Sequence, residues 1–412
     1  MKHQLIIFLL AAGLGLGLGG VIRYRLQNTP SAQIEMSGDS VEIPFEIYGR
    51  HLFLKGRLND TTPSDWILDS GAADVFINEA KTKALQLKPP THNLLSGDWG
   101  SRSTTDVSGV VLQLGPLILR DRESAKIPPA EMDGLNQYFG RRFDGILGYE
   151  FFEQLVTEID FRRRQVRLFR PQTYRYQGTG LRIPLQMDGD RPYVEATISP
   201  YGLQPLKGRF LIDTGSNGAL GLTASCGLDR RLIAAAPRTL ARPLTTFTGT
   251  EEVVLGRVQK IQMGSLQIEQ PLTVFGANTS GVCDRVAGKI GNQILQQFKT
   301  ILDYPQRQMI LEPYATPPIA NAYEYDLSGL WLQATGPQLN TYRIGAVYAN
   351  TPAAAAKIQP GDVLKQIDGQ PATQFSLAQL RQHFSQSGQT INVTIERNKQ
   401  AFSARFLLRP LL

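Results

Sequence analysis

Two short acidic motifs contain the residues of this sequence whose types and spacing could do chemistry. Asp69-Ser70-Gly71 and Asp213-Thr214-Gly215 occur once each, and three apolar residues precede each of them. An apolar strand is a costly place to end on an ionised carboxylate. The position of the two acids therefore indicates a chemical role.

Two such acids, brought together in one fold, would form an acid–base pair. Like charges a few ångströms apart cannot both ionise cheaply, so one pKa rises and the other falls. One acid then takes a proton from a water while the other donates a proton to a substrate carbonyl. This chemistry needs no cofactor or metal. The four scattered histidines and two cysteines also give no zinc-binding pattern.

The residues beside each acid are suited to a tight, fixed turn. Gly71 and Gly215 permit a close backbone approach that a side chain would block. The hydroxyls of Ser70 and Thr214 can form local hydrogen bonds that hold the turn. We therefore predict that these four residues support two catalytic loops.

An internal repeat supplies the elements that must position the two loops. Each copy has an apolar strand before its acid and, later, an apolar pair closing on glycine, Ile146-Leu147-Gly148 or Ile290-Gly291. Each copy then ends in matching strands, with Ile159-Asp160-Phe161 in the first and Leu302-Asp303-Tyr304 in the second. Short apolar runs separated by Gly, Pro and Asp indicate β lobes with few helices. If the copies pair about a pseudo-twofold axis, Asp69 and Asp213 face each other.

The arrangement resembles the aspartic peptidase family, with its pepsin-like and retroviral-protease-like members. The resemblance rests on both acidic motifs and the downstream apolar-Gly segments, and it covers residues from about 40 to 313. It implies that Asp69 and Asp213 are the catalytic dyad and that Ser70 and Thr214 brace the two loops. It also implies a hairpin flap over the cleft, for which Trp99 and Phe247 are the candidates.

Two positions depart from the family pattern. Ser70 stands where threonine is commoner, which keeps the hydroxyl. Lys289 stands where an apolar residue is expected before Ile290-Gly291. A lysine there must reach solvent or disturb the second loop.

The C-terminal part is predicted to be a separate domain. A Pro/Ala-rich stretch predicts a linker at 315–323. Beyond it, Thr351-Pro352-Ala353-Ala354 and Gln359-Pro360-Gly361-Asp362 resemble a PDZ domain of the bacterial protease-associated kind. Such domains bind a peptide tail as an added strand, with loop amides holding its carboxylate. The resemblance implies that the binding loop is the segment Gly329, Leu330, Trp331 and Leu332. A structural cap with an empty groove is the alternative.

Composition limits the remaining function classes. The chain has 412 residues, 42% apolar content and a net charge of +7, which is typical of a globular protein with two or three domains. The basic run at 161–182 is consistent with a solvated hairpin turn or with attraction to an anionic surface. The sequence has no basic cluster with interleaved aromatics, which is the pattern that would indicate nucleic-acid binding. Cys226 and Cys283 permit one disulfide or two buried thiols.

The N-terminus predicts export. An uncharged apolar stretch at 5–22 lies between Lys2 and Arg23, and no cleavage site is evident. We expect a signal or membrane anchor at 1–25 and the remainder in the periplasm or cell envelope.

These observations predict a mainly β protein: two pseudo-twofold-related, aspartic-protease-like lobes at 38–178 and 179–314, followed by a PDZ domain at 324–412. The expected function is an aspartic endopeptidase, active as a monomer on peptide or protein substrates. The alternative is a non-catalytic envelope protein that binds peptides through its PDZ groove and uses the lobes as a scaffold.

Overall fold

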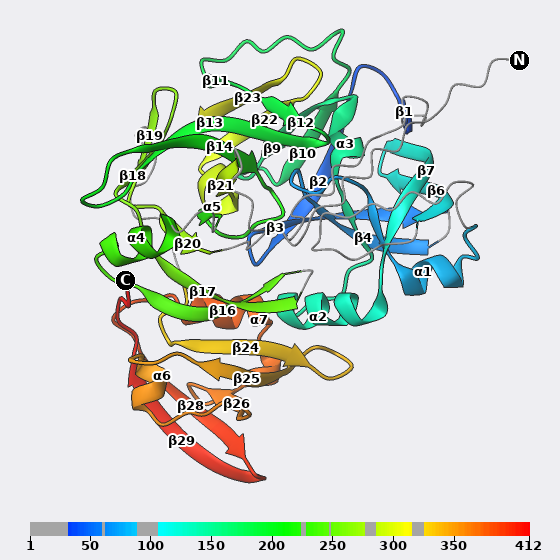
Figure 1. The fold of residues 1–412 in the computed structure, drawn as a ribbon. Coiled ribbons are helices and arrows are strands. Elements are labelled where there is room, and N and C mark those ends of the chain that lie inside the picture. The colour runs from blue at the N-terminus through cyan, green and yellow to red at the C-terminus, as the bar shows by residue number, and fades with distance from the viewer. Residues whose placement is uncertain are drawn as a thin grey trace, which may run out of the picture.

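The computed structural model of the chain describes residues 32–59, 62–88, 106–223, 228–246, 249–276, 286–314 and 325–412. Strands contain 49% of the residues and helices 14%, so the fold is mainly β, as predicted. Figure 1 shows two β lobes above a smaller C-terminal unit. Within the described ranges, no helix is long and apolar enough to cross a membrane. The predicted leader (1–25) and linker (315–323) lie outside these ranges.

The first lobe is built around β4 (Thr62–Leu68), the strand that leads into Asp69. β4 pairs antiparallel with β3 (His51–Leu58) and parallel with β8 (Gly145–Leu147). Its last three residues are all buried, as expected for a strand covered on both faces. The other elements of this lobe are β1 (Gln33–Met36), β2 (Ser40–Tyr48), β5 (Phe76–Asn78), α1 (Glu79–Ala84), β6 (Asp106–Leu114), β7 (Leu117–Ile127), α2 (Pro129–Phe139) and α3 (Tyr149–Glu153).

The second lobe repeats this plan around β14 (Leu206–Ile212), the strand that leads into Asp213. β14 pairs antiparallel with β13 (Arg191–Ser199) and parallel with β21 (Val286–Ile290), as β4 does with β3 and β8. The remaining elements are β12 (Gln186–Asp188), β15 (Leu220–Leu222), α4 (Leu228–Ala235), β16 (Leu240–Thr246), β17 (Gly249–Arg257), β18 (Lys260–Met263), β19 (Leu266–Glu269), β20 (Leu272–Phe275) and α5 (Asn292–Leu295).

A shared sheet joins the lobes with the predicted pseudo-twofold symmetry. β9 (Val156–Asp160) of the first copy pairs antiparallel with β22 (Phe298–Asp303) of the second. Thr157 faces Leu302, and Thr300 faces Ile159. Because Ile159 and Leu302 hold equal positions in the two copies, each pair is the symmetry equivalent of the other. β10 (Gln165–Phe169), β23 (Gln308–Pro313) and β11 (Leu181–Pro184) extend this sheet on either side.

The C-terminal unit has a core of its own. Its sheet has β24 (Leu330–Thr335) at one edge and β29 (Gln400–Leu407) at the other. A capping box at Ser376 and Gln379 begins α7 (Leu377–His383), whose buried Leu380 packs into the core. The unit also contains β25 (Thr341–Val347), α6 (Pro352–Ala355), β26 (Val363–Ile367), β27 (Gln370–Pro371), a 3-10 turn (Ala372–Gln374) and β28 (Thr390–Arg397).

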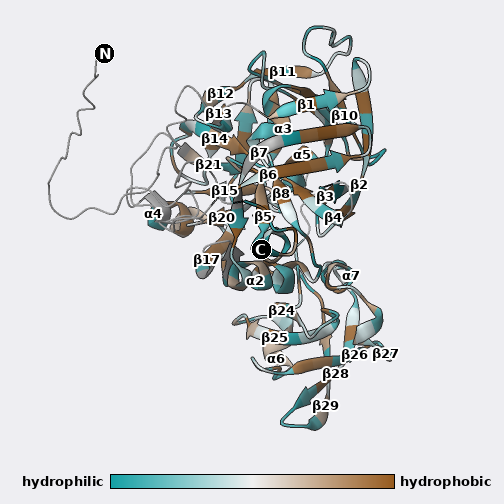
Figure 2. Ribbon diagram, turned by 90° about the vertical axis from the view of Figure 1, so that its right-hand side faces the viewer, coloured by the Kyte–Doolittle hydropathy of each residue, from teal (hydrophilic) through white to brown (hydrophobic). Residues whose placement is uncertain are grey.

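One continuous core extends through both lobes, whereas the C-terminal unit is packed separately. The strands carry much of the hydrophobic colour in Figure 2. The unit meets the lobes where β24 packs against α2. At this junction Gly140, which follows α2, lies so close to Leu377 that a Cβ added there would approach the Leu377 Cβ to 2.5 Å.

Candidate active site

Matching backbone bonds fix the two acidic loops at the ends of equivalent strands. The Asp69 amide donates to the Leu147 carbonyl at 2.9 Å, and the Asp213 amide donates to the Ile290 carbonyl at 3.0 Å. A Cβ on Gly291 would lie 2.6 Å from the Gly218 carbonyl, and a Cβ on Gly148 would meet the first loop in the same way. The apolar-Gly segments of the repeat therefore support the loops from behind.

Two hydroxyls join the loops across the boundary between the lobes. The Ser70 amide donates to Thr214 Oγ1 at 2.9 Å, and the Thr214 amide donates to Ser70 Oγ at 3.1 Å. The Ser70 hydroxyl donates to the Ile212 carbonyl at 2.7 Å, and the Thr214 hydroxyl donates to the Leu68 carbonyl at 2.9 Å. Both side chains are fully buried. The four bonds give the loops a fixed, symmetric spacing.

The same arrangement brings the two acids together. A Cβ on Gly215 would lie 2.2 Å from Asp69 Cγ, and a Cβ on Gly71 would lie 2.9 Å from Asp213 Cγ. Each acid thus lies against the glycine of the other copy, where only a residue without a side chain fits. Both acids are buried, with Asp69 6% and Asp213 7% exposed.

Electrostatics place a proton on Asp69. Burial, and then the charge of Asp213, raise the pKa of Asp69 to about 7. The hydrogen bond from the Gly71 amide, 2.8 Å long, and the charge of Lys289 act in the opposite direction and are outweighed. Asp69 is therefore protonated below neutral pH, which is the state that a general acid requires.

Lys289 reaches solvent in part, as one of the two expectations requires, and it does not disturb the second loop. Its Nζ lies 3.0 Å from Asp213 Oδ2, and its side chain is 40% exposed while that of Asp213 is 9% exposed. The register of β14 with β21 continues through Leu211 and Lys289 to Ile212 and Ile290. Burial would lower the pKa of Lys289, but the charge of Asp213 and the hydrogen bond to it outweigh burial and raise that pKa. The site therefore has a third charged group.

Several supporting residues gave no recognisable signal in the sequence. Asn292 Nδ2 donates to the Thr214 carbonyl at 2.6 Å, and the Tyr304 hydroxyl donates to the Ser70 carbonyl at 3.3 Å. His51 is buried with its ring 4.6 Å from that of Phe139, and burial lowers its pKa to about 4. The contacts of these three residues depend on how the lobes pack. The sequence shows only that Tyr304 and Phe161 hold equal positions in the repeat.

The predicted PDZ loop lies at the start of an edge strand. Gly329 adopts a left-handed conformation (φ 79°), and Leu330, Trp331 and Leu332 begin β24. The Leu330 amide already donates to Ser328 Oγ at 3.1 Å. The prediction of a loop is therefore wrong for Leu330, Trp331 and Leu332, which lie in a strand whose burial alternates, with Leu330 and Leu332 inside.

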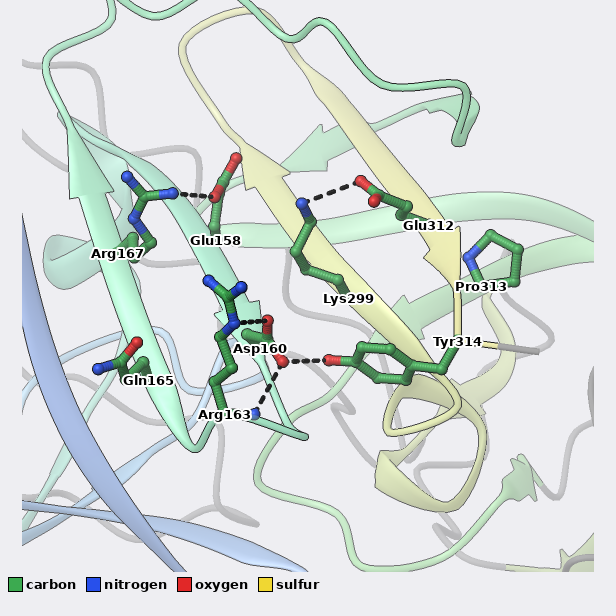
Figure 3. A pocket seen from close by; sticks show the side chains of 9 residues that line it. All are labelled: Glu158, Asp160, Arg163, Gln165, Arg167, Lys299, Glu312, Pro313 and Tyr314. Carbon is green, nitrogen blue, oxygen red and sulfur yellow. Dashed lines mark hydrogen bonds and ion pairs between the residues drawn. The ribbon is translucent and has the colours of Figure 1, made fainter.

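A pocket separate from the two acidic loops lies on the sheet shared by the lobes (Figure 3). It has a volume of about 210 Å³, and neither Asp69 nor Asp213 lines it. Its charges are compensated by three ion pairs, Lys299–Glu312 at 3.0 Å, Arg167–Glu158 at 3.7 Å and Arg163–Asp160 at 3.9 Å. This balance leaves no net charge to attract a ligand.

Four predicted residues cannot be placed. The flap candidates Trp99 and Phe247, and both Cys226 and Cys283, lie outside the described residues. Within the described ranges, no cluster of three or more His, Cys, Asp or Glu side chains could hold a metal ion.

Comparison with known proteins agrees with both resemblances. A family model for an aspartyl protease matches residues 54–151, and one for a PDZ domain matches residues 343–397. The chain thus carries an aspartyl-protease-like domain and a C-terminal PDZ domain, which is a peptide- or protein-binding module. The first match includes Asp69 but ends before Asp213, so the role of the second copy rests on the geometry above. No curated protein matches the chain.

Proposed function

We propose that the protein is an aspartic-type endopeptidase that hydrolyses peptide bonds with a water held between Asp69 and Asp213. The observation that supports this most directly is the cross-lobe pairing of Ser70 with Thr214, which holds each buried acid against the glycine of the other loop. A structural ion pair would not need two symmetric loops that place two like-charged acids together.

In this mechanism the two acids have different starting roles. Ionised Asp213 accepts a proton from the water, whose oxygen attacks the peptide carbonyl carbon. Protonated Asp69 donates its proton to the carbonyl oxygen, which gives a neutral tetrahedral diol. Collapse of the diol breaks the carbon–nitrogen bond: Asp213 gives its proton to the leaving nitrogen, and one diol hydroxyl returns a proton to Asp69. The ammonium of Lys289 stabilises the negative charge on Asp213 before the water is activated.

The test is hydrolysis of an unfolded protein by the full chain between pH 3 and 7. Asp69→Asn and Asp213→Asn should each reduce cleavage by at least about a thousandfold, since both acids act in the same step. A statine-type inhibitor should block the wild type. Asp74→Asn, which changes the nearby buried acid of the same loop, serves as a control for fold. Cleavage that survives both dyad variants would reject the proposal.

A non-catalytic function is the second candidate, and the Lys289–Asp213 ion pair favours it. A carboxylate already paired with an ammonium is a weaker base than a free one. In that case the lobes would serve as a scaffold and the PDZ domain alone would bind peptides. Wild-type protein that binds peptides yet shows no cleavage, with no gain in Lys289 variants, would support this second candidate.

We also propose that the protein works outside the cytoplasm, anchored by residues 1–25, and is active as a monomer. The uncharged stretch at 5–22 supports the anchor, and the presence of both acids in one chain supports the monomer. Fractionation of cells expressing a tagged chain tests the first point. Sedimentation of the active species tests the second.

A further inference from the structure

The cavity at the junction of the three units is the strongest unexplained feature of the molecule. Its volume is about 700 Å³, and both lobes and the PDZ domain line it. The PDZ contribution includes residues of α7 and of β24, the edge strand to which a peptide would add. The charged side chains of its lining are Arg50, Arg164, Arg242, Arg381 and Asp326. With four cations and one acid, the cavity attracts anions.

A short series of contacts connects this cavity to the catalytic loop. Asn217 lies four residues after Asp213, and its Nδ2 donates to the Tyr138 hydroxyl at 3.3 Å. The guanidinium of Arg381, from α7 of the PDZ domain, stacks over the Tyr138 ring at 5.0 Å. One tyrosine of the first lobe therefore contacts both the second lobe and the PDZ domain beside the dyad.

Two arginines of this cavity have unused binding capacity. Arg242, on β16, has a buried Nε that has no hydrogen-bond partner among the described residues. Arg381 donates a long bond of 3.5 Å to the Leu332 carbonyl. Neither arginine forms an ion pair with any carboxylate that the structure describes. Both side chains line the same cavity, together with Tyr138 and Tyr348.

The loop amides of the PDZ domain are already occupied. The Ser328 amide donates to Asp326 Oδ1 at 2.8 Å, and the Leu330 amide donates to Ser328 Oγ. A peptide carboxylate is therefore better received by guanidinium groups, which present paired N–H donors to it. Gly140, at the end of α2, packs against Leu377 and Ala334 of the PDZ domain.

We propose that Arg242 and Arg381, with Tyr138, form a carboxylate-binding subsite for the peptide that the dyad cleaves. This inference rests on the proposed function. Asn217 is at most ~14 Å along the chain from Asp213, and an extended peptide spans ~3.3 Å per residue. With the further span through Tyr138 to Arg381, the recognised carboxylate lies at most about eight residues from the cleaved bond. An acidic side chain and a free C-terminus both supply this group.

Three otherwise identical fluorogenic peptides separate these sources. One has Glu five residues from the scissile bond and an amidated end, one has Gln with the amide, and one has Gln with a free C-terminal carboxylate. We expect kcat/KM to be about tenfold higher for at least one carboxylate peptide than for the neutral one. Arg242→Gln and Arg381→Gln should each bring that ratio close to one. Equal rates for all three peptides with the wild type would overturn the inference.

Arg405→Gln is the matched control because Arg405 is exposed on β29, at the opposite edge of the PDZ sheet from β24. This variant should retain the wild-type ratio. Fluorescence polarisation measures binding of the same labelled peptides to the Asp69→Asn variant. This assay separates the proposed subsite from the proposed peptidase function. Acid preference in binding without any wild-type cleavage would reject only the proposed function. Cleavage with no preference in either assay would reject only the subsite.

Discussion

At the scale of single residues, Lys289 makes the two acids of the dyad unequal. Its ammonium pairs with Asp213, whereas Asp69 keeps its proton up to a pKa of about 7. In a symmetric pair either acid can carry the shared proton. Here the charge of Lys289 assigns the proton to Asp69, so proton transfer during hydrolysis starts in one direction.

Replacing Lys289 by Met should change the pH dependence of hydrolysis. The substitution removes the positive charge that lies beside the dyad. The alkaline limb, where Asp69 loses its proton near pH 7, should move up, because the charge of Lys289 lowers the pKa of Asp69. The measurement is kcat/KM from pH 3 to 9.

Lys289→Arg serves as the conservative control, since it keeps the positive charge beside Asp213. Its profile should stay near that of the wild type. A Met variant with an unmoved alkaline limb would show that Lys289 has no part in setting the protonation of Asp69.

The sequence allowed prediction of the acids but not of this ion pair. Asp69 and Asp213 carry a local motif and an equal place in a repeat, so their meeting follows from symmetry. The position of the Lys289 ammonium depends on the register of β21 against β14 and on the direction of one flexible side chain. Neither property has a pattern in the sequence.

At the scale of elements, α2 has two roles that its sequence does not announce. It positions Tyr138 beside the catalytic loop, and its C-terminal end packs against β24 and α7 of the PDZ domain. The strands and the helix of the PDZ domain have local sequence patterns, of period 2 for strands and of helical period for α7. The docking of α2 joins segments far apart in sequence, so no local pattern predicts it.

Two glycine substitutions in this region should have opposite effects. Gly140 has φ 68° and no room for a Cβ, so Gly140→Ala should lower the free energy of unfolding by about 1–3 kcal/mol. Gly134 lies inside α2 with nothing within 4 Å of an added Cβ. Gly134→Ala should therefore stabilise the protein by up to about 1 kcal/mol through helix propensity.

Denaturant unfolding measures both changes, and hydrogen exchange locates them. In Gly140→Ala, amides of β24 and α7 should exchange faster because the contact between α2 and the PDZ domain is displaced. Unchanged exchange there, together with lower stability, would mean that the left-handed turn alone causes the loss.

At the scale of the whole molecule, the lobes form one packed body and the PDZ domain another. β9 and β22 pair across the boundary between the copies, and the core continues through both lobes. The PDZ core is separate. We therefore expect two thermal transitions rather than three, with both lobes unfolding together.

Calorimetry on two core variants assigns these transitions. Leu380→Ala, in the PDZ core, should destabilise only the PDZ transition by about 2–5 kcal/mol. Leu302→Ala, in β22 of the shared sheet, should lower the transition of the lobes by a similar amount. A Leu302 variant in which only one lobe unfolds early would contradict the expected cooperativity.

The exchange of hydroxyl bonds between Ser70 and Thr214 also makes the two halves of the chain dependent on each other. Each hydroxyl accepts from the opposite loop and donates to the opposite strand, so neither half satisfies its own buried polar groups. A fragment that ends before the second copy would therefore expose these polar groups without their partners, and it would tend to associate with other chains. Supplied together, two such fragments have the complementary bonds needed to reassemble without a covalent link between them.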